Sequence, residues 1–533
     1  MSDQRSWERY CRWLYNDEGL GLRVDVSRMN FDEAFLSRMA EPIARALAAM
    51  SALEGGAKAN VDEDSMVGHY WLRAPRLAPA QQIGRSIEQS WASVKRFVRS
   101  VHDGQIAPQR GDSFYVALVI GIGGSALGPQ FLCDALGGPD DPMIIRFLDN
   151  TDPDGIDRVL AELDEALEQT LVIVTSKSGS TIETRNGMAE VGAAYQRKGL
   201  DFARHAIAIT QEGSTLHRRA VDERWLATFP MWDWVGGRTS VTSAVGLLPA
   251  ALQGVDTEAL LGGAREGDAA TRAADPLKNP AALLALMWYY AGQGRGERNM
   301  IVLPYRDRLA LLGRYLQQLV MESIGKARDR KGNEVSQGLT VFGNKGSTDQ
   351  HSFVQQLRDG RNDFFVTFLD VLQQRAERSV EVEPALTAGD YLSGFLYGTR
   401  EALHAAGRES ITISLERFDA RSLGALIALF ERAVGLYAEL IDVNAYDQPG
   451  VEAGKKAASG LLAMQKQILA SLRSCAGEPR TAEQVANDVH SSGSVEDVLH
   501  LLEHLARSPD HGVSRVAVGG PKTWAYAARA SGK

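Results

Sequence analysis

The chain has 533 residues, 58 of them basic and 67 acidic, so its formal net charge is −9. Hydrophobic residues make up 44% and charged residues 23% of the sequence, which is typical of a folded globular protein and excludes disorder or a fibrous repeat as the main state. The length predicts about two to four domains. A net acidic chain disfavours nucleic acid or an anionic membrane as the general partner, although a small anion in a local pocket is compatible with it.

The cysteines and the apolar stretches bear on the location of the protein. Cys11, Cys133 and Cys475 are widely spaced and odd in number, which disfavours a disulfide framework and favours the reducing cytoplasm. We expect no signal peptide, because the first residues contain no apolar core segment. No apolar stretch reaches the roughly 18 residues that span a bilayer. The sequence therefore predicts a cytoplasmic protein without a membrane partner.

Short apolar runs alternate with longer helical patterns along most of the chain. The predicted strands lie at 115–120, 143–148, 171–175 and 206–210, and in a second series at 300–304, 339–342, 364–369 and 411–415. Helical spacing follows at 183–198 and 308–326, among others. Buried strands that alternate with helices predict parallel βαβ units, so we expect the α/β class with two parallel sheets flanked by helices. We expect a helical N-terminal arm at 1–105, α/β domains at 106–275 and 276–475, and a helical extension at 476–533.

A glycine-rich segment follows the first predicted strand. Residues 119–129 read VIGIGGSALGP, and glycines there allow the backbone to turn tightly and to approach a ligand at a helix N-terminus. A dinucleotide fingerprint starting at Gly121 would need glycine where Ala126 stands, but its looser form accepts alanine, so a dinucleotide is only weakly excluded. A tight turn without a ligand is the alternative.

A hydroxyl-rich segment follows another predicted strand. Residues 175–184 read TSKSGSTIET and combine six hydroxyl groups, a lysine and a glycine before a helix. Short donors, a helix dipole and one cation are what a phosphate group needs. The alternative is a helix cap at Ser180 or Thr181. Two such loops at the ends of parallel strands favour phosphate binding, since ligands of these sheets lie beyond the carboxyl ends of the strands.

Four further segments contain polar residues in suggestive places. VGGRTS places Arg238 after two glycines, where a guanidinium could stabilise an oxyanion. ESIGK places Glu322 near a helix C-terminus, where the unfavourable dipole suits a general base. QHSF contributes His351, and YDQPGVEAGK contributes Gln448 and Lys455 around a helix start. Taken singly, each also has an ordinary structural explanation as a surface residue, a cap or a packing residue.

These segments, in this order, resemble the glucose-6-phosphate isomerase (phosphoglucose isomerase) family. The resemblance rests on GIGGS, SKSGSTIET, VGGR, ESIGK, QHSF and YDQPGVEAGK and runs from about residue 121 to 455. It implies two sugar-isomerase domains, a homodimer, no metal and no cofactor. It also implies the reversible conversion of glucose 6-phosphate to fructose 6-phosphate through ring opening and a cis-enediol(ate), in glycolysis and gluconeogenesis.

The resemblance implies roles residue by residue. Glu322 matches the base that moves the proton between two carbons, Arg238 the cation near the enediolate, and His351 and Lys455 the ring-opening pair. In the family the histidine comes from the neighbouring subunit. The matched substrate-binding residues are Gly124, Ser125, Ser176, Lys177 (through its backbone), Ser178, Thr181, Gln318 and Gln448.

Several positions depart from the common family pattern. Thr239 stands where many members have an aromatic residue, Asn344 and Lys345 replace Glu-Pro, and the phosphate loop reads SKSGST rather than SKTFTT. None of these changes removes a proposed catalytic group. They leave open a dual isomerase that also accepts mannose 6-phosphate, and a non-catalytic sugar-phosphate-binding regulator of the same fold is a second alternative.

One motif of another class occurs near the end of the chain. His500, Glu503 and His504 fit the HxxEH zinc pattern, in which two histidines one helical turn apart share a metal. The residues after His504 include no glutamate that could complete the site. A solvated amphipathic helix is therefore the favoured interpretation.

Overall fold

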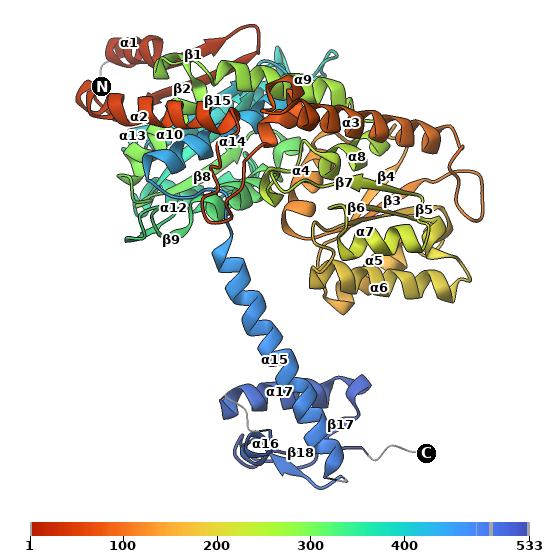
Figure 1. Cartoon of the computed structure of the whole chain (residues 1–533). Helices are drawn as coiled ribbons and strands as arrows, with labels where there is room; N and C mark the ends of the chain where they lie inside the picture. Colours follow the sequence, from red (N-terminus) through yellow and green to blue (C-terminus); the bar gives the residue numbers. More distant parts are fainter. Residues whose placement is uncertain (1–2, 476, 490–493, 530–533) are drawn as a thin grey trace. The chain divides into compact units, whose positions relative to one another are not determined.

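The computed structural model describes residues 3–475, 477–489 and 494–529, apart from the side chains of 451–453 and 455. The chain divides into two compact units, Met1–Asp447 and Gln448–Lys533. The first unit contains two α/β regions (Figure 1), and both predicted strand series are present in it. The predicted α/β class is therefore confirmed.

The first region contains a parallel five-stranded sheet in the order β4-β3-β5-β6-β7. Its strands are β3 (Val116–Ile120), β4 (Ile144–Leu148), β5 (Thr170–Thr175), β6 (Ala206–Thr210) and β7 (Ala227–Pro230). Its helices are α3 (Gln81–His102), α4 (Leu127–Leu136), α5 (Pro153–Glu162), α6 (Ile182–Arg197), α7 (Thr215–Asp222) and α8 (Ala244–Gln253).

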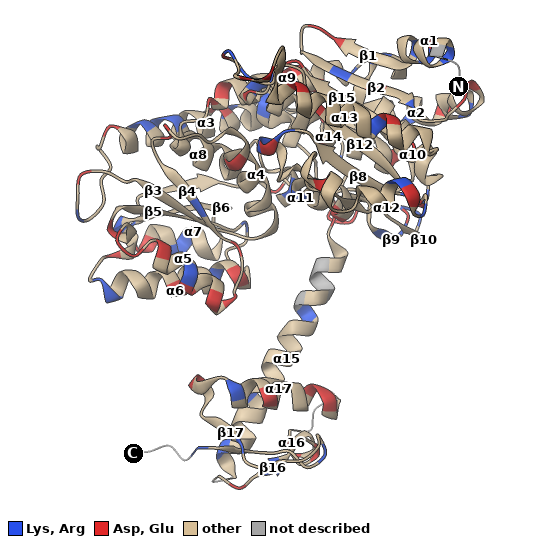
Figure 2. Cartoon of the chain, turned by 180° about the vertical axis from the view of Figure 1, so that it is seen from behind, with Lys and Arg blue, Asp and Glu red and all other residues tan. Residues whose placement is uncertain are grey.

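Alternate residues of these strands face two separate cores. Val119 and Ile173 pack with α3, α4 and α8, whereas Leu118 and Val172 pack with α5, α6 and α7. Because successive side chains of a strand point to opposite faces, an apolar run becomes a strand buried on both sides. Charged residues of both signs occur along the covering helices, and the strands beneath are largely uncharged (Figure 2).

The second region contains a mixed six-stranded sheet in the order β1-β2-β15-β12-β8-β11. Its strands are β1 (Leu14–Asp17), β2 (Leu22–Arg28), β8 (Asn299–Pro304), β11 (Val341–Phe342), β12 (Phe364–Val371) and β15 (Ser410–Leu415). Its helices are α1 (Asp3–Trp13), α2 (Glu33–Glu54), α9 (Thr257–Ala270), α10 (Pro280–Gly292), α11 (Leu312–Leu316), α12 (Val354–Asp359), α13 (Ala388–Ala405) and α14 (Ala420–Leu440). Two short ribbons accompany it: β9 (Lys326–Arg328) with β10 (Glu334–Gln337), and β13 (Glu381–Glu383) with β14 (Leu386–Thr387).

The N-terminal segment differs from the predicted helical arm because it also supplies two strands to this sheet. β2 pairs antiparallel with β15, and β1 pairs antiparallel with β2. In β2, Leu22, Val24 and Val26 are buried and alternate with polar residues, which is the pattern of a strand. The sheet is therefore parallel in its β15-β12-β8-β11 part and antiparallel at the β1-β2 edge.

The second unit has its own small core. It contains α15 (Pro449–Ser474), α16 (Ala482–Asp488), α17 (Val495–Arg507), β16 (Arg480–Thr481), β17 (Val513–Arg515) and β18 (Ala525–Ala528). Ile468, Leu472, Val498, Leu502 and Tyr526 are buried together. The C-terminal extension thus includes a three-stranded sheet besides its helices, and α15 belongs to the same unit. The boundaries predicted near 105 and 275 stay predictions. None of the described helices combines the length and hydropathy needed to cross a membrane.

Candidate functional site

The strand order of the first sheet places a topological switch point between β3 and β5. From β3 the chain passes to β4 on one side, and β5 then pairs on the other side of β3. The connections leave in opposite directions at this point, and open α/β sheets bind their ligands there, beyond the carboxyl ends of the strands. The glycine-rich loop follows β3 and the hydroxyl-rich loop follows β5. Both predicted ligand loops therefore flank this switch point.

The glycine-rich loop lies against the loop that contains Arg238. A Cβ atom on Gly124 would come within 2.1 Å of the Gly237 carbonyl, so only glycine allows the two backbones to approach this closely. The Ser240 hydroxyl donates to the carbonyl oxygens of Gly237 (2.7 Å) and Gly124 (3.3 Å). Ser125 ends the short 3₁₀ turn η3 (Gly123–Ser125) in this loop. The main-chain N–H groups of the loop are thus brought next to the VGGR segment.

The hydroxyl-rich loop is held by its own serines. The Ser176 hydroxyl accepts from the Gly179 N–H at 3.1 Å and lies 3.1 Å from the Thr181 hydroxyl. The Ser178 and Ser180 hydroxyls are 2.8 Å apart and exposed. Thr181 precedes α6, but its side chain makes no capping hydrogen bond. The structure therefore does not support Thr181 as a side-chain cap. Thr181 leaves the first N–H groups of α6 without a hydrogen bond from its side chain.

Lys177 is directed toward a neighbouring loop. Its ammonium donates to the Asp233 carbonyl at 3.0 Å and lies 3.7 Å from the Asp233 carboxylate. Burial lowers the pKa of Lys177, and the charge of Asp233 opposes that effect. The ammonium of Lys177 is therefore directed away from the hydroxyl-rich loop, and only the main chain of Lys177 belongs to the loop itself.

Arg238 is the most buried charged group of the candidate site, with 4% of its surface exposed. Its Nε donates to the Ser323 hydroxyl at 2.7 Å, and Nη2 donates to the carbonyls of Ala445 and Asp447. Its Nη1 lies 3.4 Å from Oε1 of Glu322. Burial lowers the pKa of Arg238, while Glu322 raises it, and an arginine with such partners stays charged. The guanidinium is thereby fixed beside the Glu322 carboxylate.

Glu322 ends a π-helical turn, η9 (Gln317–Glu322), that follows α11. The sequence pattern predicts one helix at 308–326, whereas the structure divides this stretch into a 3₁₀ turn, α11 and the π turn. Such π turns occur frequently at functional sites. Gln318 lies on the same turn, and its Nε2 would be 3.2 Å from a Cβ atom on Gly123. The π turn thus carries Gln318 and Glu322 to the glycine-rich loop and to Arg238.

Three supporting residues were missed by the sequence analysis. Ser323 receives the Arg238 hydrogen bond, and the buried Lys326 donates to the Glu322 carbonyl at 3.1 Å. Lys326 also lies 2.8 Å from the Asp447 carboxylate, and burial lowers its pKa against the effect of that bond. Ser323 and Lys326 stand inside ESIGK, and Asp447 precedes Gln448 in YDQPG. The ESIGK and YDQPG segments could therefore have indicated these residues. The contacts among them could not be inferred, because they join segments far apart in the sequence.

Three further predicted residues, His351, Gln448 and Lys455, stand on other segments of the chain. His351 ends the 3₁₀ turn η10 (Thr348–His351); the residue is exposed, and its side chain makes no hydrogen bond or ion pair with any described residue. Gln448 precedes α15 in the second unit. Lys455 lies on α15, and its side chain is outside the described residues.

The zinc-like motif is engaged in ordinary contacts on α17. The Glu503 carboxylate accepts from the Tyr526 hydroxyl at 2.7 Å and lies 3.3 Å from Arg515. His500 lies 3.7 Å from Glu496. Within the described ranges, no group of three or more His, Cys, Asp or Glu side chains is arranged to hold a metal ion.

The fold and this geometry define an α/β protein in which the glycine-rich loop after β3 lies against a loop whose buried arginine is paired with a carboxylate. Comparison with known proteins makes the class more specific. Residues 25–403 and 397–476 match the family model described as phosphoglucose isomerase. The chain belongs to the phosphoglucose isomerase family, and the resemblance inferred from the sequence is confirmed.

Relatives over nearly the full length agree with this assignment. The chain is 58% identical over 514 residues to the glucose-6-phosphate isomerase of Citrifermentans bemidjiense, covering 96% of this chain and 97% of the relative. It is 56% identical over 523 residues to that of a Synechococcus strain, covering 98% of both. A crystal structure of a glucose-6-phosphate isomerase from Chlamydia trachomatis superimposes with a TM-score of 0.78 at 27% identity, covering 86% of this chain and 91% of that one.

Proposed function

We propose that this chain catalyses the reversible isomerisation of glucose 6-phosphate and fructose 6-phosphate. The observation that carries the proposal is the Glu322 carboxylate, 3.4 Å from the buried Arg238 guanidinium and on the same π turn as Gln318, in a chain of this family. Moving a proton between adjacent carbons requires one base and one cation that stabilises the developing enediolate. Glu322 and Arg238 supply these two groups.

We assign the phosphate of the substrate to the loop after β5. The hydroxyls of Ser176, Ser178 and Thr181, the main chain at Lys177 and the start of α6 provide short donors at the end of a parallel strand. Gly124, Ser125, Gln318 and Gln448 line the sugar in this proposal. Phosphate binding then contributes orientation of the reacting carbons rather than chemistry.

Ring opening is assigned to His351 and Lys455. His351 is exposed and free of partners among the described residues, so it can act on a substrate bound by another chain. We propose a homodimer in which His351 reaches the site of the partner subunit, so that a complete site needs two chains. A cytoplasmic location, as inferred from the sequence, belongs to the same proposal.

The test follows hydrogen exchange at the reacting carbon. The full-length protein is incubated with fructose 6-phosphate in deuterated water, and we expect glucose 6-phosphate labelled at C2, because the enediolate is reprotonated by a base that exchanges with solvent. Glu322→Gln should lower kcat by about 10²–10⁴-fold while retaining substrate binding. Exposed Glu334→Gln serves as the matched control and should turn over like the parent.

Two outcomes would reject parts of this proposal. If the parent protein forms no glucose 6-phosphate and incorporates no deuterium, the enzyme proposal is rejected in favour of a non-catalytic sugar-phosphate-binding protein. Full activity of Glu322→Gln would remove Glu322 from the role of base. The same assay also tests the dual-specificity alternative that the departures at Thr239 and Asn344 leave open. A dual isomerase would form mannose 6-phosphate from fructose 6-phosphate in addition to glucose 6-phosphate.

A further inference from the structure

The second sheet repeats the strand order of the first. The series β4-β3-β5-β6 in one sheet corresponds to β11-β8-β12-β15 in the other, with all of these neighbours parallel. From β8 the chain passes to β11 on one side, and β12 then pairs on the other side of β8. The second sheet therefore has its own crevice between β8 and β12, at the kind of place where such sheets bind ligands.

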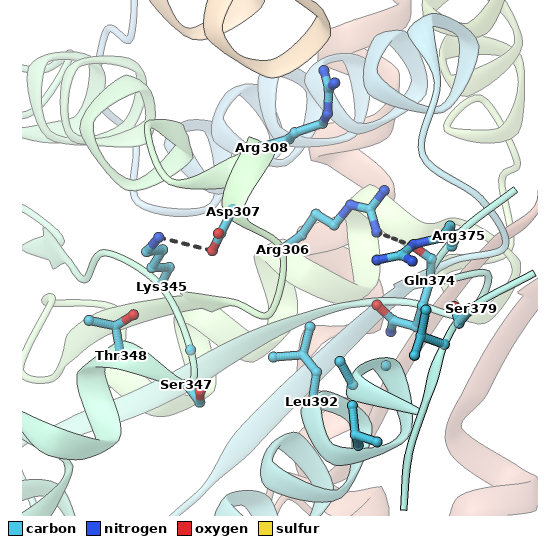
Figure 3. A pocket seen from close by; sticks show the side chains of 15 residues that line it. Arg306, Asp307, Arg308, Lys345, Ser347, Thr348, Gln374, Arg375, Ser379 and Leu392 are labelled. Atoms are coloured by element: carbon cyan, nitrogen blue, oxygen red, sulfur yellow. Dashed lines mark hydrogen bonds and ion pairs between the residues drawn. The ribbon is translucent and has the colours of Figure 1, made fainter. Parts of the chain in front are cut away.

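A cavity of about 810 Å³ occupies this place. Its walls come from the loops after β8, β11 and β12 and from the first turn of α13 (Figure 3). The volume lies within the range of about 300–1,000 Å³ that is usual for small-molecule sites. None of the residues assigned above to catalysis or to substrate binding lines it, so it is separate from the candidate active site.

The cavity is strongly basic. Arg306, Arg308, Lys345 and Arg375 line it, with Asp307 as the single acidic lining residue, so the formal charge is four minus one, or +3. Lys345 pairs with Asp307 at 2.9 Å. In an acidic chain such a local excess of positive charge is the feature that attracts an anion.

None of the three arginines forms an ion pair with a described carboxylate. Arg306 donates to the Gln374 carbonyl at 2.7 Å, and Arg308 donates to the carbonyls of Ala135 and Gly137. Carbonyl oxygens fix a guanidinium without neutralising it. Arg375 is exposed and has no hydrogen bond or ion pair with any described residue. Burial, and next the charge of Arg308, lower the pKa of Arg306, and the charge of a bound anion would act in the opposite direction.

The start of α13 adds main-chain donors to the same cavity. Ala388 and Gly389 line it, and they are the first two residues of an 18-residue helix, whose N–H groups have no intrahelical acceptor. Thr387 caps only the N–H of Asp390. In the first sheet, α6 begins at the equivalent place, directly after the strand that pairs beside β3. Cations and helix donors thus converge as they do around phosphate groups.

We propose that this cavity is a second binding site, for a small phosphate-bearing anion. Arg306 and Arg375 would supply the charge, and the first turn of α13 and the hydroxyls of Ser347 and Thr348, which also line the cavity, would supply the hydrogen bonds. The site is independent of the isomerase reaction and of the residues that perform it.

Calorimetric titration of the full chain with inorganic pyrophosphate tests the site. We expect a binding event that weakens at least tenfold in Arg306→Gln/Arg375→Gln. The single variant Arg375→Gln, whose side chain has no partner to lose, should weaken the same event in a chain that unfolds at the parent's temperature. Arg378→Gln is the matched control, because Arg378 is an exposed arginine nearby that does not line the cavity.

The proposal is overturned if pyrophosphate does not bind at millimolar concentration, or if every binding event is unchanged in both variants. An event that is lost in Ser176→Ala/Thr181→Ala but kept in the arginine variants belongs to the loop after β5 and reports on the proposed catalytic function instead.

Discussion

At the scale of single residues, the candidate site depends on one guanidinium that several groups hold in place. Arg238 bonds to Ser323 and to two main-chain carbonyls, and it lies beside Glu322. Its planar fork of donors serves three directions at once, which a lysine ammonium at the end of a flexible chain does not do. The position of the positive charge relative to Glu322 is therefore set by Ser323 and by the 445–447 segment.

We predict that Arg238→Lys lowers kcat by about 10²-fold or more and changes KM much less. The charge remains, but its place near the developing enediolate is lost, and removal of a positioned oxyanion donor typically has an effect of this size. Steady-state kinetics with fructose 6-phosphate measure it. Arg378→Lys, at an exposed position, is the control, and a kcat within twofold of the parent for Arg238→Lys would show that exact placement of the cation does not matter.

At the scale of elements, the loops at the ends of β3 and β5 were predictable, and the helix before Glu322 was predictable only in part. Leu309, Leu312, Leu316, Leu319 and Val320 form the expected apolar face and are all buried. Apolar spacing does not distinguish an α turn from a π turn, so the change at Gln317 was not visible in the sequence. β7 and the β1-β2 pair were likewise not predicted, because these strands are short or lie at a sheet edge.

We predict that Gly124→Ala abolishes most activity. The new methyl group would meet the Gly237 carbonyl at 2.1 Å, so the glycine-rich loop and the Arg238 loop must separate. Gly138→Ala is the matched control, since its nearest neighbour, an Asp141 oxygen, lies 3.8 Å from the new methyl group. Activity and thermal unfolding are measured for both. A fully active Gly124→Ala protein would mean that the two loops need not touch.

At the scale of the whole molecule, a buried ionic network connects helices from distant parts of the first unit. Arg73 makes two hydrogen bonds to Asp268 on α9, at 2.7 and 2.9 Å, and also pairs with Glu431 on α14. Arg432 bonds to Asp268 at 3.0 Å and to Glu54 at the end of α2. Burial by itself would raise the pKa of Asp268, but Arg432 and Arg73 outweigh it and lower that pKa to about 2.

We predict that Asp268→Asn lowers the free energy of unfolding by about 3–5 kcal/mol at pH 7, because two buried guanidinium groups lose their shared carboxylate. Since the folded pKa of Asp268 is depressed, its contribution is present above about pH 4, the unfolded value, and is lost as the pH falls toward 2. The difference in the free energy of unfolding between parent and Asp268→Asn should therefore become smaller as the pH falls over this range. Urea unfolding measures it, with exposed Asp140→Asn as the control; equal stability at pH 7 would contradict the prediction.

The proposed sharing of sites between subunits has a quantitative consequence. His351→Ala and Glu322→Gln chains, each inactive alone, are refolded together in equal amounts. About half of the resulting dimers are mixed, and each has one intact site, so activity should recover to about a quarter of the parent value. Assay after mixing measures this. No recovery, with mixed dimers demonstrated by mass, would show that His351 serves its own chain.

The sequence by itself determined the two strand series, the glycine-rich and hydroxyl-rich loops at the ends of β3 and β5 and the family, because buried parallel strands and close backbone approaches permit few residue types. Only the tertiary structure decided that Gly124 lies against Gly237, that Ser323 and the 445–447 segment hold Arg238, and that β1 and β2 complete the second sheet. These contacts join residues far apart in the chain, and local pattern contains no information about such pairs. The net charge of −9 likewise conceals the basic cavity at the second sheet, whose cations come together only when the chain folds.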